Sequence, residues 1–196
     1  MRVSSAVGLS LLFVAADPGA AAAQARRRAT SPPSQIQGPS LLSEFRFGFS
    51  AQDPWGPERG SGALAGEVLL AKPFTAADLF TSYFIPRPHF GGSLNLGGRQ
   101  SYAYAGVTWS VDVMPRVFVE GSLGGAVHDG KSHALVPSPT RPAIGCSPVF
   151  REAGSVGVRL SGQWSLVATV EHLSDTRSCA QDRGLTNVGA RFGYAF

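Results

Sequence analysis

The stretch NVGARFGYAF, residues 187–196, decides the fold class of this 196-residue chain. Its alternate positions are apolar, and the positions between them are small or polar. A period of two indicates a β-strand whose two faces meet different surroundings. A strand of about ten residues with one apolar and one polar face is what a transmembrane β-barrel requires. A soluble β-sandwich would show a similar alternation, so this stretch alone leaves both architectures open. The apolar positions are Val188, Ala190, Phe192, Tyr194 and Phe196.

The same alternation recurs along the chain from residue 41 onward, for example at Phe45, Phe47 and Phe49. Short connections at 113–116 and 161–163 alternate with longer ones that are rich in Gly, Pro, Asp and Arg. The periplasmic turns and extracellular loops of outer-membrane barrels alternate in this way. The candidate strands are 42–50, 63–71, 79–86, 88–96, 102–113, 116–127, 148–160, 164–174 and 187–196.

The segment 72–96 decides the number of strands. Pro73, Pro86 and Pro88 are unsuited to a central ladder, and bacterial barrels have an even number of strands. We therefore assign 79–86 to a turn or short helix, with one helical turn expected over 75–80. The sequence predicts an all-β fold over residues 41–196, an eight-stranded antiparallel transmembrane β-barrel of the bacterial outer membrane. Interior ion pairs are expected to fill it, drawn from Glu44, Arg46, Glu67, Asp112, Glu120, Arg159, Glu171 and Arg191.

The composition excludes several other classes of protein. The chain has 17 Lys and Arg, 13 Asp and Glu and a net charge of +4, and only 15% of its residues are charged. A soluble domain usually has about 25% charged residues. No stretch reaches the roughly 18 apolar residues of a membrane-spanning helix, which excludes a helical membrane protein. The arginines are scattered apart from a run at 26–28, so no nucleic-acid partner is expected.

The N-terminal residues 1–25 have the pattern of a signal peptide. Arg2 precedes the apolar stretch 6–16, and small residues offer cleavage after Ala23 or Ala25. A buried Ala-rich helix is the alternative. Residues 26–40 are polar and rich in Pro and Ser, which predicts a disordered N-terminal arm.

Two cysteines, Cys146 and Cys179, suit the oxidising compartment that export implies. They are predicted to form a disulfide, and two free buried thiols are the alternative. The histidines at 89, 128 and 133 lack the spacing of metal ligands, so no metal and no cofactor is expected.

The predicted strand 164–174 has one face that looks lipid-facing but ends in His172 and Ser174. Residues two apart on a strand lie about 6.6 Å apart and point the same way, so the imidazole can reach the hydroxyl. A serine nucleophile needs such a neighbouring base to take its proton. His-x-Ser is a short motif that is common by chance. The alternative to a catalytic pair is that His172 and Ser174 are polar rim residues at the level of the lipid headgroups.

Several runs of the chain resemble the PagL-type lipid A 3-O-deacylase family, whose members are also called acyloxyacyl hydrolases. The resemblance implies an eight-stranded outer-membrane barrel that hydrolyses the ester-linked acyl chain at position 3 of lipid A. It also implies a serine, histidine and acidic triad on the membrane-facing side near the outer leaflet. The runs are 171–175, 179–187 and 191–196, with further similarity at 86–95, 105–109, 117–121 and 128–131.

Carried onto this chain, the resemblance makes Ser174 the nucleophile and His172 its general base. The glutamate that the family has about twelve residues after the serine falls here on Thr186, which cannot carry a negative charge. The acid is therefore assigned to Asp182 or Asp175, either of which would orient His172 from a shifted position.

The partners expected from the resemblance are lipid A or lipopolysaccharide and the outer membrane, and a homodimer is left open. Arginines in the outer loops are expected to bind lipid A phosphates, with solvated loop charge as the alternative. The alternative function is a catalytically weak or inactive barrel of the same family with a structural or lipid-binding role. A secreted soluble barrel that binds a small apolar ligand is the third hypothesis. The arginines are Arg177 and Arg183, together with Arg99 and Arg141.

Overall fold

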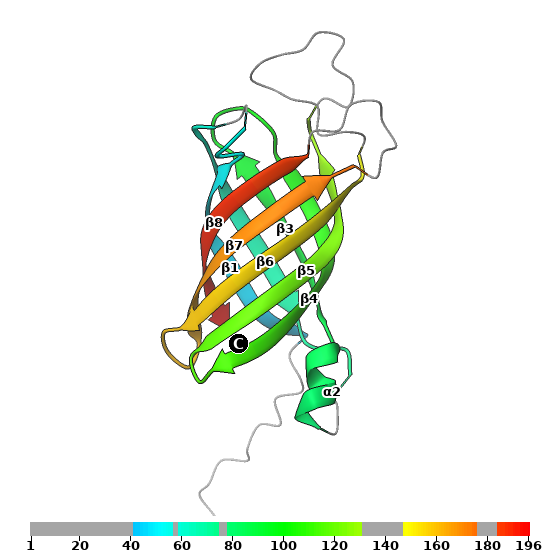
Figure 1. Ribbon diagram of the computed structural model, residues 1–196, viewed down its shortest axis with the longest axis vertical. Helices are drawn as coiled ribbons and strands as arrows, with labels where there is room; N and C mark the ends of the chain where they lie inside the picture. Colours follow the sequence, from blue (N-terminus) through cyan, green and yellow to red (C-terminus); the bar gives the residue numbers. More distant parts are fainter. Residues whose placement is uncertain (1–40, 57–58, 75–77, 131–146, 176–183) are drawn as a thin grey trace, which may run out of the picture. The chain divides into compact units, whose positions relative to one another are not determined.

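Eight antiparallel strands close into a barrel in chain order, with β1 beside β8 (Figure 1). The structure is a computed structural model that describes residues 41–56, 59–74, 78–130, 147–175 and 184–196. The predicted fold class is confirmed, and each predicted strand end lies within two residues of the observed one. The strands are β1 (Leu42–Gln52), β2 (Ser61–Leu70), β3 (Arg87–Asn95), β4 (Tyr102–Met114), β5 (Val117–His128), β6 (Val149–Arg159), β7 (Trp164–Ser174) and β8 (Leu185–Ala195).

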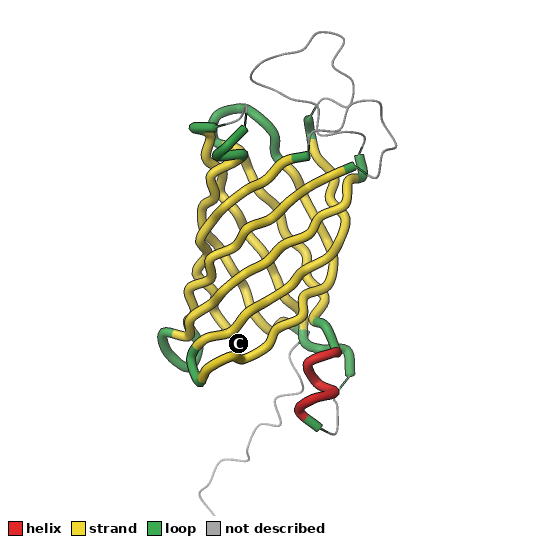
Figure 2. The backbone as a smooth tube through the Cα atoms, in the orientation of Figure 1, coloured by secondary structure: helices red, strands yellow, loops and turns green. Residues whose placement is uncertain are grey.

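The connection between β2 and β3 contains the short helix α2 (Leu79–Phe84), which lies at the same end of the barrel as the C-terminus (Figures 1 and 2). The Asp78 side chain caps it by accepting a hydrogen bond of 2.8 Å from the Thr81 backbone N–H. A helix in place of a ninth strand is therefore confirmed. It begins later than the expected turn over 75–80, and residues 75–77 lie outside the described part of the chain.

Pro88 lies inside β3 as its second residue, opposite Val107 of β4. The predicted strand 88–96 begins with this proline, although the sequence marked it as unsuited to a central ladder. The pairing of β3 with β2 starts only at His89, opposite Leu69. The proline is therefore paired with one neighbouring strand only, which is the kind of strand position where proline is tolerated.

Charged side chains occupy much of the inside of the barrel, together with a cluster of buried apolar and aromatic residues. Arg46 is buried and donates to Glu44 at 2.8 Å and to Glu120 at 2.5 Å. Arg151 donates to Glu171 at 2.6 Å, and Arg191 pairs with Glu67 and Glu171. The predicted interior ion pairs are confirmed, with Arg87 and Arg151 as members that the sequence analysis missed. The pair of Asp112 and Arg159 lies at the mouth instead, where the two side chains are 51% and 42% exposed.

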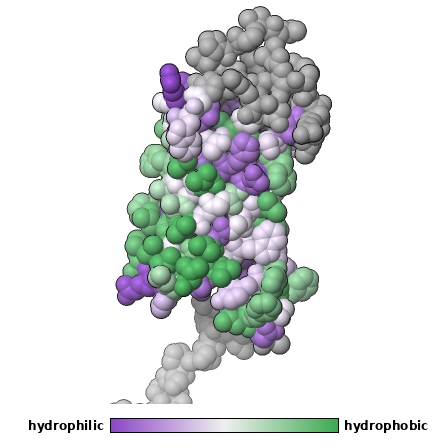
Figure 3. Space-filling view, viewed as in Figure 1, coloured by the Kyte–Doolittle hydropathy of each residue, from purple (hydrophilic) through white to green (hydrophobic). Residues whose placement is uncertain are grey.

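Most outward positions of the strands are apolar. Phe45, Phe47 and Phe49 on β1 and Phe192 on β8 are exposed, and Phe47 lies 6.1 Å from Phe192 between ring centroids. The wall formed by β5 to β8 is largely hydrophobic in its lower part (Figure 3). Within the described ranges no helix is long and apolar enough to cross a membrane. The outer wall is thus suited to lipid, whereas the interior is suited to paired charge.

Candidate active site

Strand β7 places His172 and Ser174 on the outside of the barrel. Both are half-buried, and they continue the outward row of Trp164, Leu166 and Val170. The intervening Leu173 faces inward and is fully buried. The strand alternation therefore fixes the same face for the imidazole and the hydroxyl, as the sequence predicted.

A threonine hydroxyl holds the imidazole on the β8 side. The Nδ1 atom of His172 lies 2.8 Å from Oγ1 of Thr186, which is its cross-strand partner in the β7–β8 ladder. Thr186 is the residue that the sequence analysis found where the resembled family has an acid. The hydroxyl can accept the Nδ1 proton and fix the ring, but it brings no negative charge.

Gly184 closes over the other edge of the ring. Its φ is +62°, a left-handed conformation that favours glycine. A Cβ at this position would lie 2.7 Å from Cε1 and 2.9 Å from Nε2 of His172, so a larger residue would displace the imidazole. The glycine at position 184 therefore leaves the space that the His172 ring occupies.

The nucleophile predicted from the sequence stands beyond His172 on the same face. Ser174 lies opposite Phe150 of β6. Among the described residues the structure records no hydrogen bond between Ser174 and His172. Such catalytic bonds are often long in the absence of substrate and shorten when substrate is bound.

Of the two acids predicted from the sequence, the described part of the chain contains only Asp175. Asp175 is buried and follows the inward positions Glu171 and Leu173 beyond the end of β7. Other predicted residues lie outside the described part of the chain, so their roles and the disulfide stay predictions. They are Asp182, Arg177, Arg183, Cys146 and Cys179.

An apolar groove of about 470 Å³ starts at His172 on the outside of the wall. Its floor is a cross-strand row in which Trp109 is paired with Gly121, Gly121 with Gly154, and Gly154 with Val170. A Cβ on either glycine would meet open space, so the missing side chains are what hollow out the wall. The groove gives an extended apolar chain a place to lie against the barrel.

Glu152 also lines this groove, and the sequence analysis did not select it. It is exposed on the outward face of β6, directly opposite His172 in the β6–β7 ladder. The signal in the sequence was its alternation with Phe150, which places an acid on a face where apolar residues are the rule. The described residues hold no group of three His, Cys, Asp or Glu side chains arranged to bind a metal ion.

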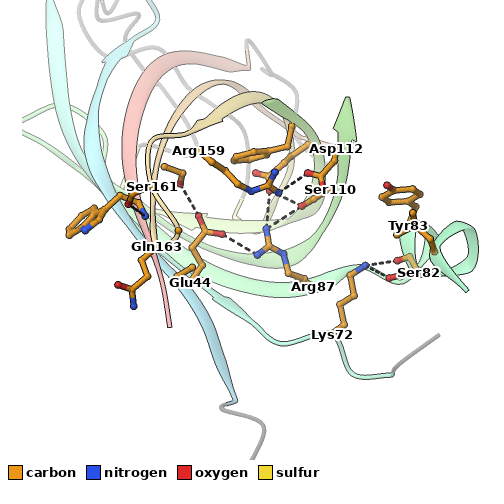
Figure 4. A pocket seen from close by; sticks show the side chains of 17 residues that line it. Glu44, Lys72, Ser82, Tyr83, Arg87, Ser110, Asp112, Arg159, Ser161 and Gln163 are labelled. Carbon is orange, nitrogen blue, oxygen red and sulfur yellow. Dashed lines mark hydrogen bonds and ion pairs between the residues drawn. The ribbon is translucent and has the colours of Figure 1, made fainter. Parts of the chain in front are cut away.

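A polar recess of about 370 Å³ opens at the opposite end of the barrel (Figure 4). Its charges are already paired: Arg87 contacts Glu44 at 3.0 Å, and Arg159 contacts Asp112 at 2.6 Å. Lys72 donates to the Ser82 hydroxyl at 3.0 Å. The recess touches β7 at its first residues, about 26 Å from His172 at the usual strand rise, so it is separate from the candidate site.

A closed eight-stranded barrel with an apolar outer wall and a charge-filled interior defines an outer-membrane barrel protein. Within that class, the chain belongs to the family described as Lipid A 3-O-deacylase (PagL), whose model matches residues 44–195. The family acts on lipid A. The barrel fold of this protein and its membership of the family place it in the bacterial outer membrane.

Two solved structures are similar to the chain. One is the crystal structure of the outer membrane enzyme PagL, with 11% identity and a TM-score of 0.60 over 79% of this chain and 100% of that one. The other comes from the de novo design of transmembrane β-barrels, with 12% identity and a TM-score of 0.51 over 82% of this chain and 98% of that one. At these identities the likeness shows the fold alone. None of the curated proteins matches the chain.

Proposed function

We propose that this protein is a lipid A 3-O-deacylase-like ester hydrolase, with Ser174 as nucleophile and His172 as general base. The observation that carries the proposal is that both side chains lie on the outward face of β7 and that His172 lines the apolar groove. Lipid A lies in the leaflet beside this wall, and one of its acyl chains fits the apolar lining of the groove. The scissile ester then lies next to the serine.

The Thr186 contact is compatible with the histidine tautomer that the mechanism requires, because the threonine hydroxyl can accept a proton from Nδ1. With the Nδ1 proton directed to Thr186 Oγ1, the Nε2 lone pair is available to Ser174. Nε2 takes the serine proton as Oγ attacks the ester carbonyl, and the resulting imidazolium returns that proton to the sugar oxygen as the ester bond breaks. Nε2 then takes a proton from water as the water oxygen attacks the acyl-serine, and this proton passes to Ser174 Oγ as the Oγ–acyl bond breaks and the fatty acid leaves.

A non-catalytic barrel of the same family is the second candidate. The threonine in place of an acid favours it, because a serine–histidine pair without its acid can lose about 10⁴-fold in turnover. Such a protein would keep the groove as a lipid-binding surface without cleaving the ester.

Mass spectrometry of lipid A from cells that produce this protein separates the two candidates. Loss of one acyl chain with the intact protein, and no loss with Ser174→Ala, is the result that we expect. Heat-modifiable gel migration of both variants serves as the control for folding. Unchanged lipid A beside a folded barrel would contradict hydrolysis of that lipid and favour the second candidate.

A further inference from the structure

Glu152 is an exception on the outer wall. In the eight strands as described, it is the only Asp, Glu, Lys or Arg side chain at an outward-facing position; elsewhere on that face of β6 the residues are Phe150, Gly154, Val156 and Val158. No hydrogen bond or ion pair is recorded for it within the described residues. A charge on the lipid face of a barrel is unfavourable, and such residues are commonly kept for function.

The strand register places this carboxylate beside the proposed base. Glu152 and His172 are direct cross-strand partners, and Thr186 is the partner of His172 on the other side. Directly opposite residues have Cβ atoms about 4.5–5.5 Å apart. The outer face thus carries a row of carboxylate, imidazole and hydroxyl across β6, β7 and β8.

The charged side chains inside the barrel are separated from His172 by the barrel wall. Arg151 and Glu171 flank the row in sequence, but they face inward, where both Arg151 and Arg191 pair with Glu171. Among the described residues, Glu152 is therefore the charge that shares the lipid-facing side with His172. Low-dielectric surroundings strengthen the attraction between a carboxylate and an imidazolium at this separation.

We propose that Glu152 is the acidic partner of His172, which compensates for the threonine at position 186. Glu152 acts through His172 and is a positioning residue: its carboxylate stabilises the imidazolium that forms when Nε2 takes the Ser174 proton. Thr186 sets the orientation of the ring. The two tasks of a triad acid are thus divided between two strands, and the proton never reaches Glu152. The inference rests on the proposed function.

The test measures two properties of the refolded barrel in detergent micelles: hydrolysis of lipid A, and the rate at which a fluorophosphonate probe labels the serine. Four variants are compared with the parent protein: Ser174→Ala, Glu152→Gln, Glu152→Asp, and Glu152→Gln combined with Thr186→Glu. Glutamine keeps the shape and removes the charge, and the double variant supplies a carboxylate from the opposite strand. Heat-modifiable migration checks that each variant is folded.

We expect Glu152→Gln to lower kcat and the labelling rate by roughly 10- to 10³-fold, with KM changed less than about threefold. Glu152→Asp should keep most of the activity. Thr186→Glu should restore the labelling rate in the Glu152→Gln background, which neither a structural role nor a substrate contact of Glu152 would produce.

Two results would overturn the inference, and they differ in what they say of the proposed function. Serine labelling that Glu152→Gln leaves unchanged, or a rise in KM alone without rescue, overturns the role of Glu152 and leaves Ser174 in place. Labelling that is absent, or insensitive to Ser174→Ala, overturns both. Rapid labelling that depends on Glu152, without hydrolysis of lipid A, supports the inference and shows that the substrate is a compound other than lipid A.

Discussion

At the scale of single residues, the contact between His172 Nδ1 and Thr186 Oγ1 is the hydrogen bond most open to test. Thr186→Val keeps the shape of the side chain and removes the acceptor. We expect kcat to fall about tenfold with little change in KM, since one hydrogen bond to a ring contributes about 1–1.5 kcal/mol. Steady-state hydrolysis of lipid A checks this, with Thr186→Ser as the control that keeps the hydroxyl. Equal turnover in the valine variant would mean that the ring is oriented by other contacts.

The two catalytic candidates were predictable because strand alternation fixes a face without any tertiary information. His172 and Ser174 needed only the period of two and the apolar residues before them. The pairing of Glu152 with His172 was also predictable from the sequence. The turn centred on Gly162 pairs residues at equal distances on either side, so Glu152, ten positions before it, faces His172, ten positions after it. The contact with Thr186 was not predictable, since it depends on the register between β7 and β8, two strands that are separated by ten residues in the sequence.

At the scale of elements, the groove is made by β5 and β6, because each contributes a glycine to its floor. Gly154→Leu would fill the floor without a backbone clash, since a Cβ there meets open space. We expect kcat/KM for lipid A to fall at least about tenfold, as an occupied pocket rejects part of an acyl chain. Gly66→Leu on β2 is the matched control, because it also meets no atom and lies away from the groove. An equal decrease of kcat/KM in both variants would mean that an added leucine anywhere on the lipid-facing surface lowers activity, and that the groove has no specific role.

The strand ends were predictable to within two residues, whereas two features of the strands were not. Pro88 enters β3 because the neighbouring ladder has not yet begun. Arg151 escaped notice because its strand alternates Gly, Ala, Ser and Val, which gives a weak pattern for the two faces. Its partners come from β2 and β7, and such contacts across the interior are set by barrel closure and not by the local sequence.

At the scale of the whole molecule, the charge-filled interior should dominate stability. Arg46 is buried between Glu44 and Glu120, so Arg46→Met leaves two carboxylates with reduced compensation. We expect the free energy of unfolding to fall by about 3–5 kcal/mol. Urea unfolding of the barrel in lipid vesicles, followed by tryptophan fluorescence, measures the change. Arg159→Met removes the partly exposed pair with Asp112 and should cost about 1 kcal/mol or less. Similar losses for the two variants would show that burial does not govern these pairs.

The direction of the barrel in the membrane decides whether the candidate site meets lipid A. His172 and Ser174 lie at the end of β7 that is nearer the 53–60 and 175–184 connections, whereas the turn at 161–163 lies at the opposite end. Because lipid A occupies the outer leaflet, we expect the 53–60 connection to face the cell exterior. An epitope inserted after Pro54 should bind antibody on intact cells, and one inserted after Ser161 should bind only after the outer membrane is permeabilised. The reverse pattern would place Ser174 in the phospholipid leaflet, where a lipid A ester is out of its reach, and would contradict the proposed substrate whatever the chemistry of the site.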